Sequence, residues 1–412
     1  MALRRHATVC ILLLALGSCG AAGPDGGNPD PTPPPGSKKD GMTFYRDVLP
    51  ILQRSCWGCH AAGGIAPFAL TTYEEVRALH QPVANAVAAR RMPPWMPREQ
   101  GCEPLSGARR LSQDEIDTIT SWSLDGAPAG DPADAPPPPM EAPALPWVDA
   151  TLDAGVDYTP DVRRPDDYHC LVVDPRLQRD EELIGYGIIP GVRRQVHHVL
   201  VFAADRAAAQ AVDASEPGPG WTCFSGTRVQ GERLVAGWVP GMSSVRYPDG
   251  TGVLIAAGDV LILQIHYNHT GRPVPDRTAI QLQLARQRVP RRAYISHLSE
   301  PTFLIPPGAQ GHSTSQTLTL PVPLRVYGVA PHMHTLGRRI QVSAGSRCLV
   351  DIPQWNFHWQ QFYFFAAGGL LLERGTVVKM TCTWDNPGTQ AVRWGEGTAD
   401  EMCLSYFYVT AP

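Results

Sequence analysis

The chain has few charged residues and no basic excess. Only 18% of its 412 residues are charged, and the formal net charge is −4. A protein that binds nucleic acid needs cationic side chains to displace counterions from phosphates, so nucleic acid is excluded as an expected partner. The apolar run Val9–Leu16 is too short to span a bilayer.

What is present describes a globular chain with several parts. The hydrophobic fraction is 43%, which provides ample core, and the length suggests about two or three domains. Two stretches poor in apolar residues read as linkers, a flexible one over 19–41 and a stiffer, proline-rich one over 126–145. They bracket a small domain at 42–125.

The N-terminus predicts export. Arg4 and Arg5 precede the run Val9–Leu16, and small residues follow it, as in a secretory signal. The Leu-Gly-Ser-Cys order ending at Cys19 resembles a bacterial lipobox, which predicts a lipoprotein signal peptide over 1–18 and lipidation of Cys19. An ordinary signal peptide with a coincidental cysteine is the alternative. Either way we expect a periplasmic or cell-surface protein, and with lipidation one anchored to a membrane, the outer membrane being favoured.

A CxxCH motif at Cys56, Cys59 and His60 predicts covalent haem attachment. The two thiols can form thioethers to the vinyl groups of one haem, and the histidine can bind the iron. A local disulfide with a surface histidine, or a fragment of a zinc site, is the bland alternative. Helical patterns surround the motif at Tyr45–Leu52 and at Leu111–Leu124, which opens with a Ser-x-x-Glu capping box.

This segment, 42–125, resembles a small class I cytochrome c, an all-α fold with one covalently attached haem c. The resemblance places the second axial ligand in a proline-stiffened loop after a helix, which favours Met92. Met96 is the close rival and His80 the weaker one.

The remainder, 146–412, is rich in short apolar runs that favour strands. Such runs are Leu183–Ile189, Val196–Phe202, Val260–Tyr267, Ala279–Ala285, Leu324–Val329, Arg339–Ser343, Val377–Trp384 and Met402–Val409, while Arg206–Val212 has helical spacing and Trp355–Phe365 resembles a core strand with its turn. We expect mostly antiparallel β structure in two sandwiches, 146–289 and 290–412, with the junction at a proline-containing break.

Histidines concentrate in this second half. His332 and His334 are two residues apart, so on an extended segment they share one face. The pair His197-His198 lies inside the apolar run Val196–Phe202, and His266 stands at the end of the run Val260–Ile265. With the thioether of Met402 they form a ligand set that suits copper, because imidazole binds both copper oxidation states and sulfur favours Cu(I).

These motifs occur in the order and approximate spacing of the copper type II ascorbate-dependent monooxygenases, the family of peptidylglycine alpha-hydroxylating and dopamine beta-monooxygenase. The resemblance covers roughly 168–409. It implies two jelly-roll-like β-sandwiches that hold one copper each. The implied ligands are His197, His198 and His266 for an electron-transfer copper, and His332, His334 and Met402 for an oxygen-activating copper. Adjacent strand residues face opposite ways, so His197 and His198 require a bulge to share a metal.

The resemblance further implies hydroxylation of a substrate C–H bond with O2 and two electrons. Gln264 matches a residue near the first copper and Tyr406 a tyrosine near the oxygen site. Implied disulfides are Cys170–Cys223 and Cys382–Cys403. Cys102 and Cys348 are left over as candidates for a bridge between domains.

Two positions depart from the peptide-amidating enzymes. Ala330 stands where they place an arginine for the substrate carboxylate, and Leu404 stands where they have an asparagine. A carboxylate-terminated peptide loses its main anchor, so peptide amidation is not expected.

The expected protein is therefore an exported copper monooxygenase with a fused haem domain. Its partners are O2, a small substrate of open identity, and an electron donor, either an ascorbate-like reductant or a redox protein. The competing class is a non-enzymatic, lipid-anchored electron-transfer or copper-handling protein. Structural roles are expected for the remaining histidines of this half, which are His169, His269, His297, His312 and His358.

Overall fold

The computed structural model describes residues 39–62, 66–137, 145–163, 166–224, 226–239, 242, 244–268 and 272–412. The expected signal peptide, Cys19, most of the first linker, His269 and residues 138–144 of the second linker lie outside this range. Within it, no helix is both long enough and apolar enough to cross a membrane.

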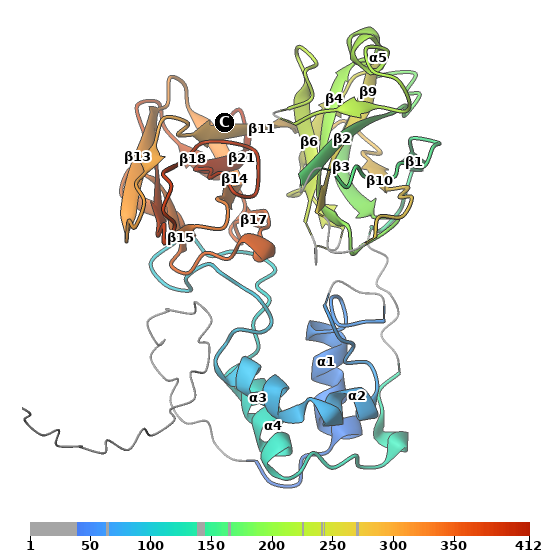
Figure 1. Ribbon diagram of the computed structural model, residues 1–412, viewed down its shortest axis with the longest axis vertical. Helices are drawn as coiled ribbons and strands as arrows, with labels where there is room; N and C mark the ends of the chain where they lie inside the picture. Colours follow the sequence, from blue (N-terminus) through green and yellow to red (C-terminus); the bar gives the residue numbers. More distant parts are fainter. Residues whose placement is uncertain are drawn as a thin grey trace, which may run out of the picture. The chain divides into compact units, whose positions relative to one another are not determined.

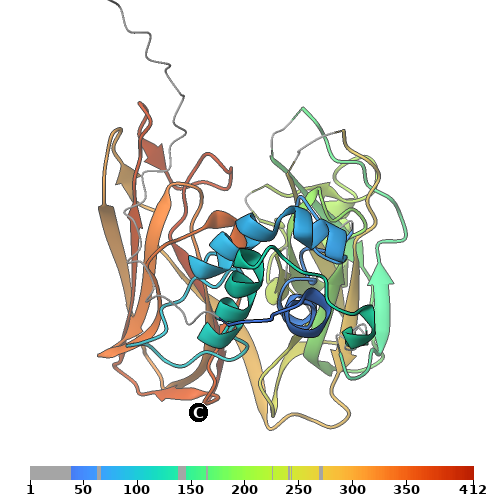
Figure 2. The ribbon, with the colours of Figure 1, turned by 90° about the horizontal axis from the view of Figure 1, so that it is seen from below.

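The described N-terminal part is helical, and its helices lie together in both views (blue to teal in Figures 1 and 2). The elements are η1 (Phe44–Val48), α1 (Leu49–Ser55), α2 (Tyr73–Ala78), α3 (His80–Ala88), α4 (Gln113–Leu124) and η2 (Pro132–Asp134). The expected helices correspond to η1 with α1 and to α4. Ser112 caps α4 as the motif requires: its hydroxyl accepts from the Glu115 N–H, and the Glu115 carboxylate accepts from the Ser112 N–H. Phe44, Leu52 and Trp122 form the centre of this core.

The next part contains a five-stranded antiparallel sheet in the order β5-β2-β9-β4-β6. Its strands are β2 (Asp166–Val173), β4 (Val196–Asp205), β5 (Trp221–Thr222), β6 (Arg233–Trp238) and β9 (Asp259–Asn268), and α5 (Arg206–Asp213) follows β4. Strand β9 is the centre, and nine of its ten residues are buried. Apolar clusters cover both faces of the sheet, one of them including Ala209 of α5.

A ten-stranded sheet follows the path β1-β10-β3-β8-β11-β21-β14-β17, with β7 on β3 and β18 on β14. These strands are β1 (Ala150–Asp153), β3 (Glu181–Ile189), β7 (Val245–Arg246), β8 (Thr251–Ile255), β10 (Ala279–Leu284), β11 (Arg291–Ser299), β14 (Leu324–His332), β17 (Tyr363–Phe364), β18 (Leu370–Leu372) and β21 (Leu404–Thr410). Its first half packs on the five-stranded sheet, where Leu183 and Ile280 meet Leu171 and Leu263.

One strand joins the two expected sandwiches. Residues 291–293 of β11 pair in parallel with β8, and residues 293–299 pair antiparallel with β21. The hydrogen-bonded sheet therefore continues across the expected junction near residue 290, where the proline-containing break suggested separate sheets. The break is a turn that leads into a shared strand.

The second sandwich is closed by a four-stranded sheet, β13-β19-β15-β16. Its strands are β13 (His312–Thr319), β15 (Gly337–Ala344), β16 (Arg347–Ile352) and β19 (Val377–Trp384), and β12 (Leu304–Ile305) pairs with β20 (Val392–Arg393). Val342 and Met380 of this layer pack with Val326 and Phe407 of the ten-stranded sheet. Architecture and strand content thus agree with the expected all-β half.

The segment Trp355–Phe365 is not the core strand that its aromatic content suggested. It forms a short 3-10 turn, η3 (Phe357–Trp359), and only the two-residue strand β17. His358 is exposed on this turn. The alternating apolar residues of this segment suggested a strand. The Asn356 side chain instead stabilises a turn, because it accepts the His358 N–H at 2.9 Å.

Residues after Met92 leave the helices and contact the second sandwich. Cys102 forms a disulfide with Cys348 of β16, with an S–S distance of 2.04 Å. Main-chain hydrogen bonds run alongside it, from the Arg98 N–H to the Asp351 carbonyl (2.8 Å) and from the Glu103 N–H to the Cys348 carbonyl (2.9 Å). Residues 95–106, expected within the haem domain, form a connector on the second sandwich, where they contact β16 and β17.

Candidate metal centre

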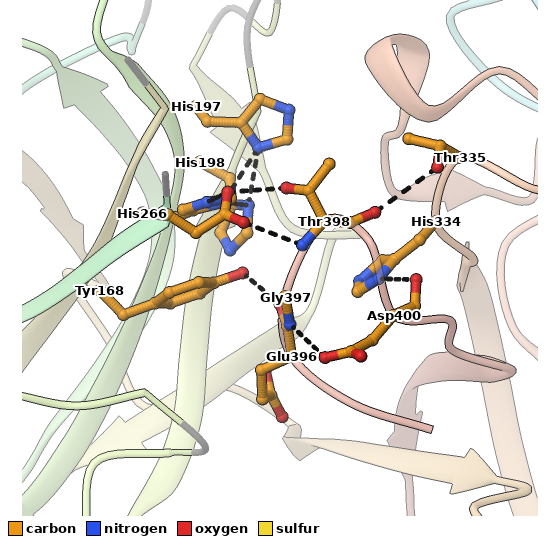
Figure 3. Close-up of polar contacts among 11 residues, drawn as sticks. Tyr168, His197, His198, His266, His334, Thr335, Glu396, Gly397, Thr398 and Asp400 are labelled. Atoms are coloured by element: carbon orange, nitrogen blue, oxygen red, sulfur yellow. Dashed lines mark hydrogen bonds and ion pairs between the residues drawn. The ribbon is translucent and has the colours of Figure 1, made fainter. Parts of the chain in front are cut away.

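The first histidine group stands on the central strands of the five-stranded sheet. A register shift between Val196 and His198 interrupts the pairing of β4 with β9. This bulge turns both His197 and His198 toward His266 of β9, which plain strand alternation would prevent. Figure 3 shows the three imidazoles converging.

The convergence has the dimensions of a metal site. The Nδ1 atoms of the three rings are 3.2–3.3 Å apart. A point equidistant from them lies about 1.9 Å from each, close to the usual metal–imidazole distance. Two Nδ1 atoms that both carry lone pairs have no proton to share, so they cannot hydrogen-bond to each other. Three Nδ1 atoms that face one another this closely therefore fit a bound cation.

A carboxylate orients His266 from behind. Asp166 Oδ1 lies 2.9 Å from His266 Nε2 and accepts its N–H, which leaves Nδ1 free for the metal. Asp166 also accepts from the N–H (3.0 Å) and the hydroxyl (2.7 Å) of Thr398. Burial opposes ionisation of Asp166, but these hydrogen bonds outweigh it and lower its pKa. The Tyr168 ring stacks on His266, with centroids 4.1 Å apart.

Burial favours the neutral form of His197 and His198. It lowers the pKa of His197 to about 3 and that of His198 well below its usual value, with neighbouring histidines acting in the same direction. Neutral imidazole is the form that binds a metal, so these two ligands need no deprotonation at physiological pH.

The second group uses the opposite ring nitrogens. His332 ends β14 and His334 follows it, with ring centroids 5.1 Å apart. Nδ1 of His332 is bonded to Gln360 Oε1, and Nδ1 of His334 donates to the Asp400 carbonyl at 3.0 Å. Both rings are therefore fixed as Nδ1–H tautomers with Nε2 available. Burial lowers the pKa of His332 to about 3.

Glu401 connects the main chains of His334 and Met402. Its fully buried carboxylate accepts the N–H groups of His334 (3.0 Å) and Leu336 (2.6 Å), the Trp384 indole N–H (2.9 Å) and the Met402 N–H (3.3 Å). The Cys382–Cys403 disulfide fixes the same segment from the other side. His334 and Met402 are thus held by one carboxylate.

Both groups line one cavity of about 560 Å³. Its wall includes His198, His332, His334 and Met402, together with the expected Gln264 and Tyr406 and the departures Ala330 and Leu404. The aromatic part of the wall comprises Tyr168, Tyr186, Phe202, Trp238, Tyr247, Tyr294, Phe362, Phe364 and Trp394. The amide of Gln264 donates to the Cys223 carbonyl at 3.1 Å, and Cys223 is bonded to Cys170.

Comparison with known families identifies part of the chain. Residues 295–410 match the model of the copper type II ascorbate-dependent monooxygenase, C-terminal domain. This region is similar to the C-terminal domain of the copper monooxygenases. It contains His332, His334 and Met402, and the match supports a copper-dependent monooxygenase, an oxidoreductase of a family that uses O2 and ascorbate.

Other comparisons add no functional argument. No curated protein matches the chain. Among solved structures, the major capsid protein P2 from bacteriophage PM2 is 9% identical, covering 63% of this chain and 97% of that one with a TM-score of 0.29. The infectious bursal disease virus VP2 subviral particle is 10% identical, covering 63% of this chain and 70% of that one with a TM-score of 0.18. A Paenibacillus xanthan lyase is 13% identical, covering 69% of this chain and 28% of that one with a TM-score of 0.18.

Most residues that support the two histidine groups had no sequence signal. Asp166 and Gln360 bind the far side of a histidine ring, and Glu401 accepts the His334 main-chain N–H. Thr398 acts one step further out, because its hydroxyl donates to Asp166. Figure 3 shows the segment Glu396–Asp400 running between the two groups, with Thr398 on the side of His266 and Asp400 on that of His334. Only the acidic residues beside Met402 hinted at this role.

The CxxCH residues also have a compatible arrangement. Cys56 and Cys59 are not paired with each other, and burial raises the pKa of both thiols. His60 Nδ1 is 3.1 Å from the Phe68 carbonyl, which leaves Nε2 for an iron ligand.

The candidate distal ligands differ in their surroundings. The Met96 sulfur accepts the Asn356 N–H at 3.1 Å and packs on the second sandwich, so this rival has a structural role. His80 is bonded through Nδ1 to Ser123 Oγ at 2.9 Å. Met92 is half-buried in the loop after α3.

Proposed function

We propose that the chain is an exported copper-dependent monooxygenase that hydroxylates a C–H bond of a small substrate with O2. The observation that carries this proposal is the convergence of three Nδ1 atoms beside one cavity that also exposes His332, His334 and Met402. The family match at 295–410 supplies the enzyme class independently.

The two groups suit different copper roles. His197, His198 and His266 would hold one ion in an all-imidazole site, in which Asp166 orients His266, and such a site favours electron transfer. His332, His334 and Met402 would hold the other, where the weak thioether leaves room for O2. When bound, copper supplies one-electron chemistry and O2 activation. The protein favours the neutral form of His197, His198 and His332 by burial. It fixes the tautomers of His266, His332 and His334 by hydrogen bonds, and apolar side chains around the cavity limit water.

The cavity wall favours an apolar substrate without a carboxylate. Glu232 lies in the wall, burial raises its pKa to about 7, and its buried Oε2 has no partner among the described residues. Arg233 is already paired with Asp259. Ala330 and Leu404 in the same wall are apolar. None of these side chains offers a free cation to bind a substrate carboxylate.

We further propose that a haem c on Cys56, Cys59 and His60 supplies electrons, alone or alongside an ascorbate-like reductant, with Met92 as the second axial ligand. The free thiols and the Nδ1-bonded His60 support this assignment. Export, lipidation at Cys19 and membrane anchoring complete the proposal and are supported by the N-terminal sequence alone.

Metal analysis and oxygen uptake test the proposal. The purified full chain should contain two coppers and one haem, and it should consume O2 with a reductant only when both coppers are present. A screen of small apolar compounds should yield a product that has gained one oxygen atom. One copper per chain, or uptake that is independent of copper, would favour the non-enzymatic electron-transfer or copper-handling class.

A further inference from the structure

One aromatic ring contacts a histidine from each group. The Phe357 ring stacks on His197 with centroids 4.8 Å apart and planes 22° apart. The same ring meets His334 edge-on, at 5.6 Å and 76°. Phe357 is 8% exposed, so these contacts exclude most water from its surface.

Core packing does not account for this residue. Four apolar clusters comprise the cores of the described chain, and Phe357 belongs to none of them, although its neighbour Trp355 belongs to one. A large apolar ring outside every core is buried here against imidazoles. Its contacts with the two histidine groups therefore explain its position.

The backbone of Phe357 is fixed by the residue that orients His332. The Gln360 side chain binds His332 Nδ1 through Oε1 and donates through Nε2 to the Phe357 carbonyl at 2.7 Å. Trp355 donates its indole N–H to the His334 carbonyl at 3.1 Å. The turn is thus hydrogen-bonded to both histidines of the second group, while its ring reaches the first group.

We propose that Phe357 is a positioning residue that bridges the two copper centres, setting their separation and providing the packed path for electron transfer between them. This inference rests on the proposed function. Hydroxylation of one C–H bond by O2 takes two electrons and two protons and releases one water; the reductant supplies both electrons. One of them would be supplied from a copper held by His197, His198 and His266, and this electron would have to pass to the second group in each turnover.

The test compares Phe357→Leu with Phe357→Tyr in the full, copper-loaded chain. One electron is placed on the copper pair and trapped at the second centre with carbon monoxide; photolysis releases it, and Cu(II) electron paramagnetic resonance follows its redistribution. We expect unchanged copper content and Cu(II) spectra in both variants, with a redistribution rate about tenfold lower in Phe357→Leu and near wild type in Phe357→Tyr, which keeps the ring.

Trp359→Leu is the matched control. Trp359 lies in the same turn, and in the described part of the chain it has no ring contact with either histidine group. A wild-type rate in Phe357→Leu, or an equal loss in Trp359→Leu, would overturn the bridge while leaving the two-copper function intact. If the wild-type chain binds fewer than two coppers, the proposed function itself fails, and the bridge with it.

Discussion

At the scale of single residues, Glu401 is the carboxylate that joins His334 and Met402. Four N–H groups converge on its buried carboxylate. Glu401→Gln would turn an amide toward donors and leave at least one unpaired. We expect a loss of about 2–4 kcal/mol in the free energy of unfolding and weaker copper binding at the second group, measured by denaturant titration and metal analysis.

The exposed Glu99 is the control for that change. It makes one ion pair, with Arg110 at 2.8 Å, and its side chain is 59% exposed. Glu99→Gln should alter the free energy of unfolding by less than about 0.5 kcal/mol. Equal effects of the two substitutions would show that the buried network does not stabilise the site.

Glu232 provides a pH signature. Burial raises its pKa to about 7, above the value of an unfolded chain. A carboxyl with a raised folded pKa stabilises the fold when protonated, so its contribution is complete below about pH 4 and is lost as pH rises through 7. The melting temperature of wild type minus that of Glu232→Gln should therefore fall between pH 5 and pH 8. A difference that stays constant over this range would contradict the assignment.

At the scale of elements, the sequence predicted the apolar strands but not the polar strand or the bulge that accompany them. Period-two apolar runs located β3, β4, β9 and β19 because each strand buries one or both faces. The polar strand β13 escaped, since its serines and threonines bond laterally, as Ser313 does to Thr383 at 2.8 Å. The bulge at His198 could be inferred only through the family resemblance, because a one-residue register shift has no compositional signature.

The connector is the element whose place was least expected. Two leftover cysteines hinted at a bridge, but its main-chain bonds to β16 could not be foreseen, since they involve no particular side chains. Replacing both Cys102 and Cys348 by alanine removes a link between residues 246 apart. We expect about 2–5 kcal/mol lower stability and faster proteolysis near residue 102, with copper content unchanged.

Removing the Cys170–Cys223 disulfide is the informative contrast. The Cys223 carbonyl accepts the Gln264 amide, so this change should disturb the first histidine group as well as stability. Copper analysis of both double variants distinguishes the two cases. Copper loss after removal of Cys102 and Cys348 would mean that the connector, too, supports the metal sites.

At the scale of the whole molecule, the chain combines a CxxCH motif with two histidine groups. The connector lies between α3 and α4 and attaches the helical part to β16 through a disulfide and main-chain hydrogen bonds. Covalent linkage keeps the effective concentration of donor and acceptor high. If the haem is the donor, ferrous haem in the full chain should reoxidise in O2 faster with copper bound than without, at a rate independent of protein concentration. Stopped-flow absorbance measures this directly.

Two variants separate the roles of copper and haem. His334→Ala, which removes a proposed ligand of the second group, should slow reoxidation to the copper-free rate. Met92→Ala should alter the haem spectrum while leaving two coppers bound. Reoxidation indifferent to copper would assign electron supply to an external reductant and leave the haem with a separate task.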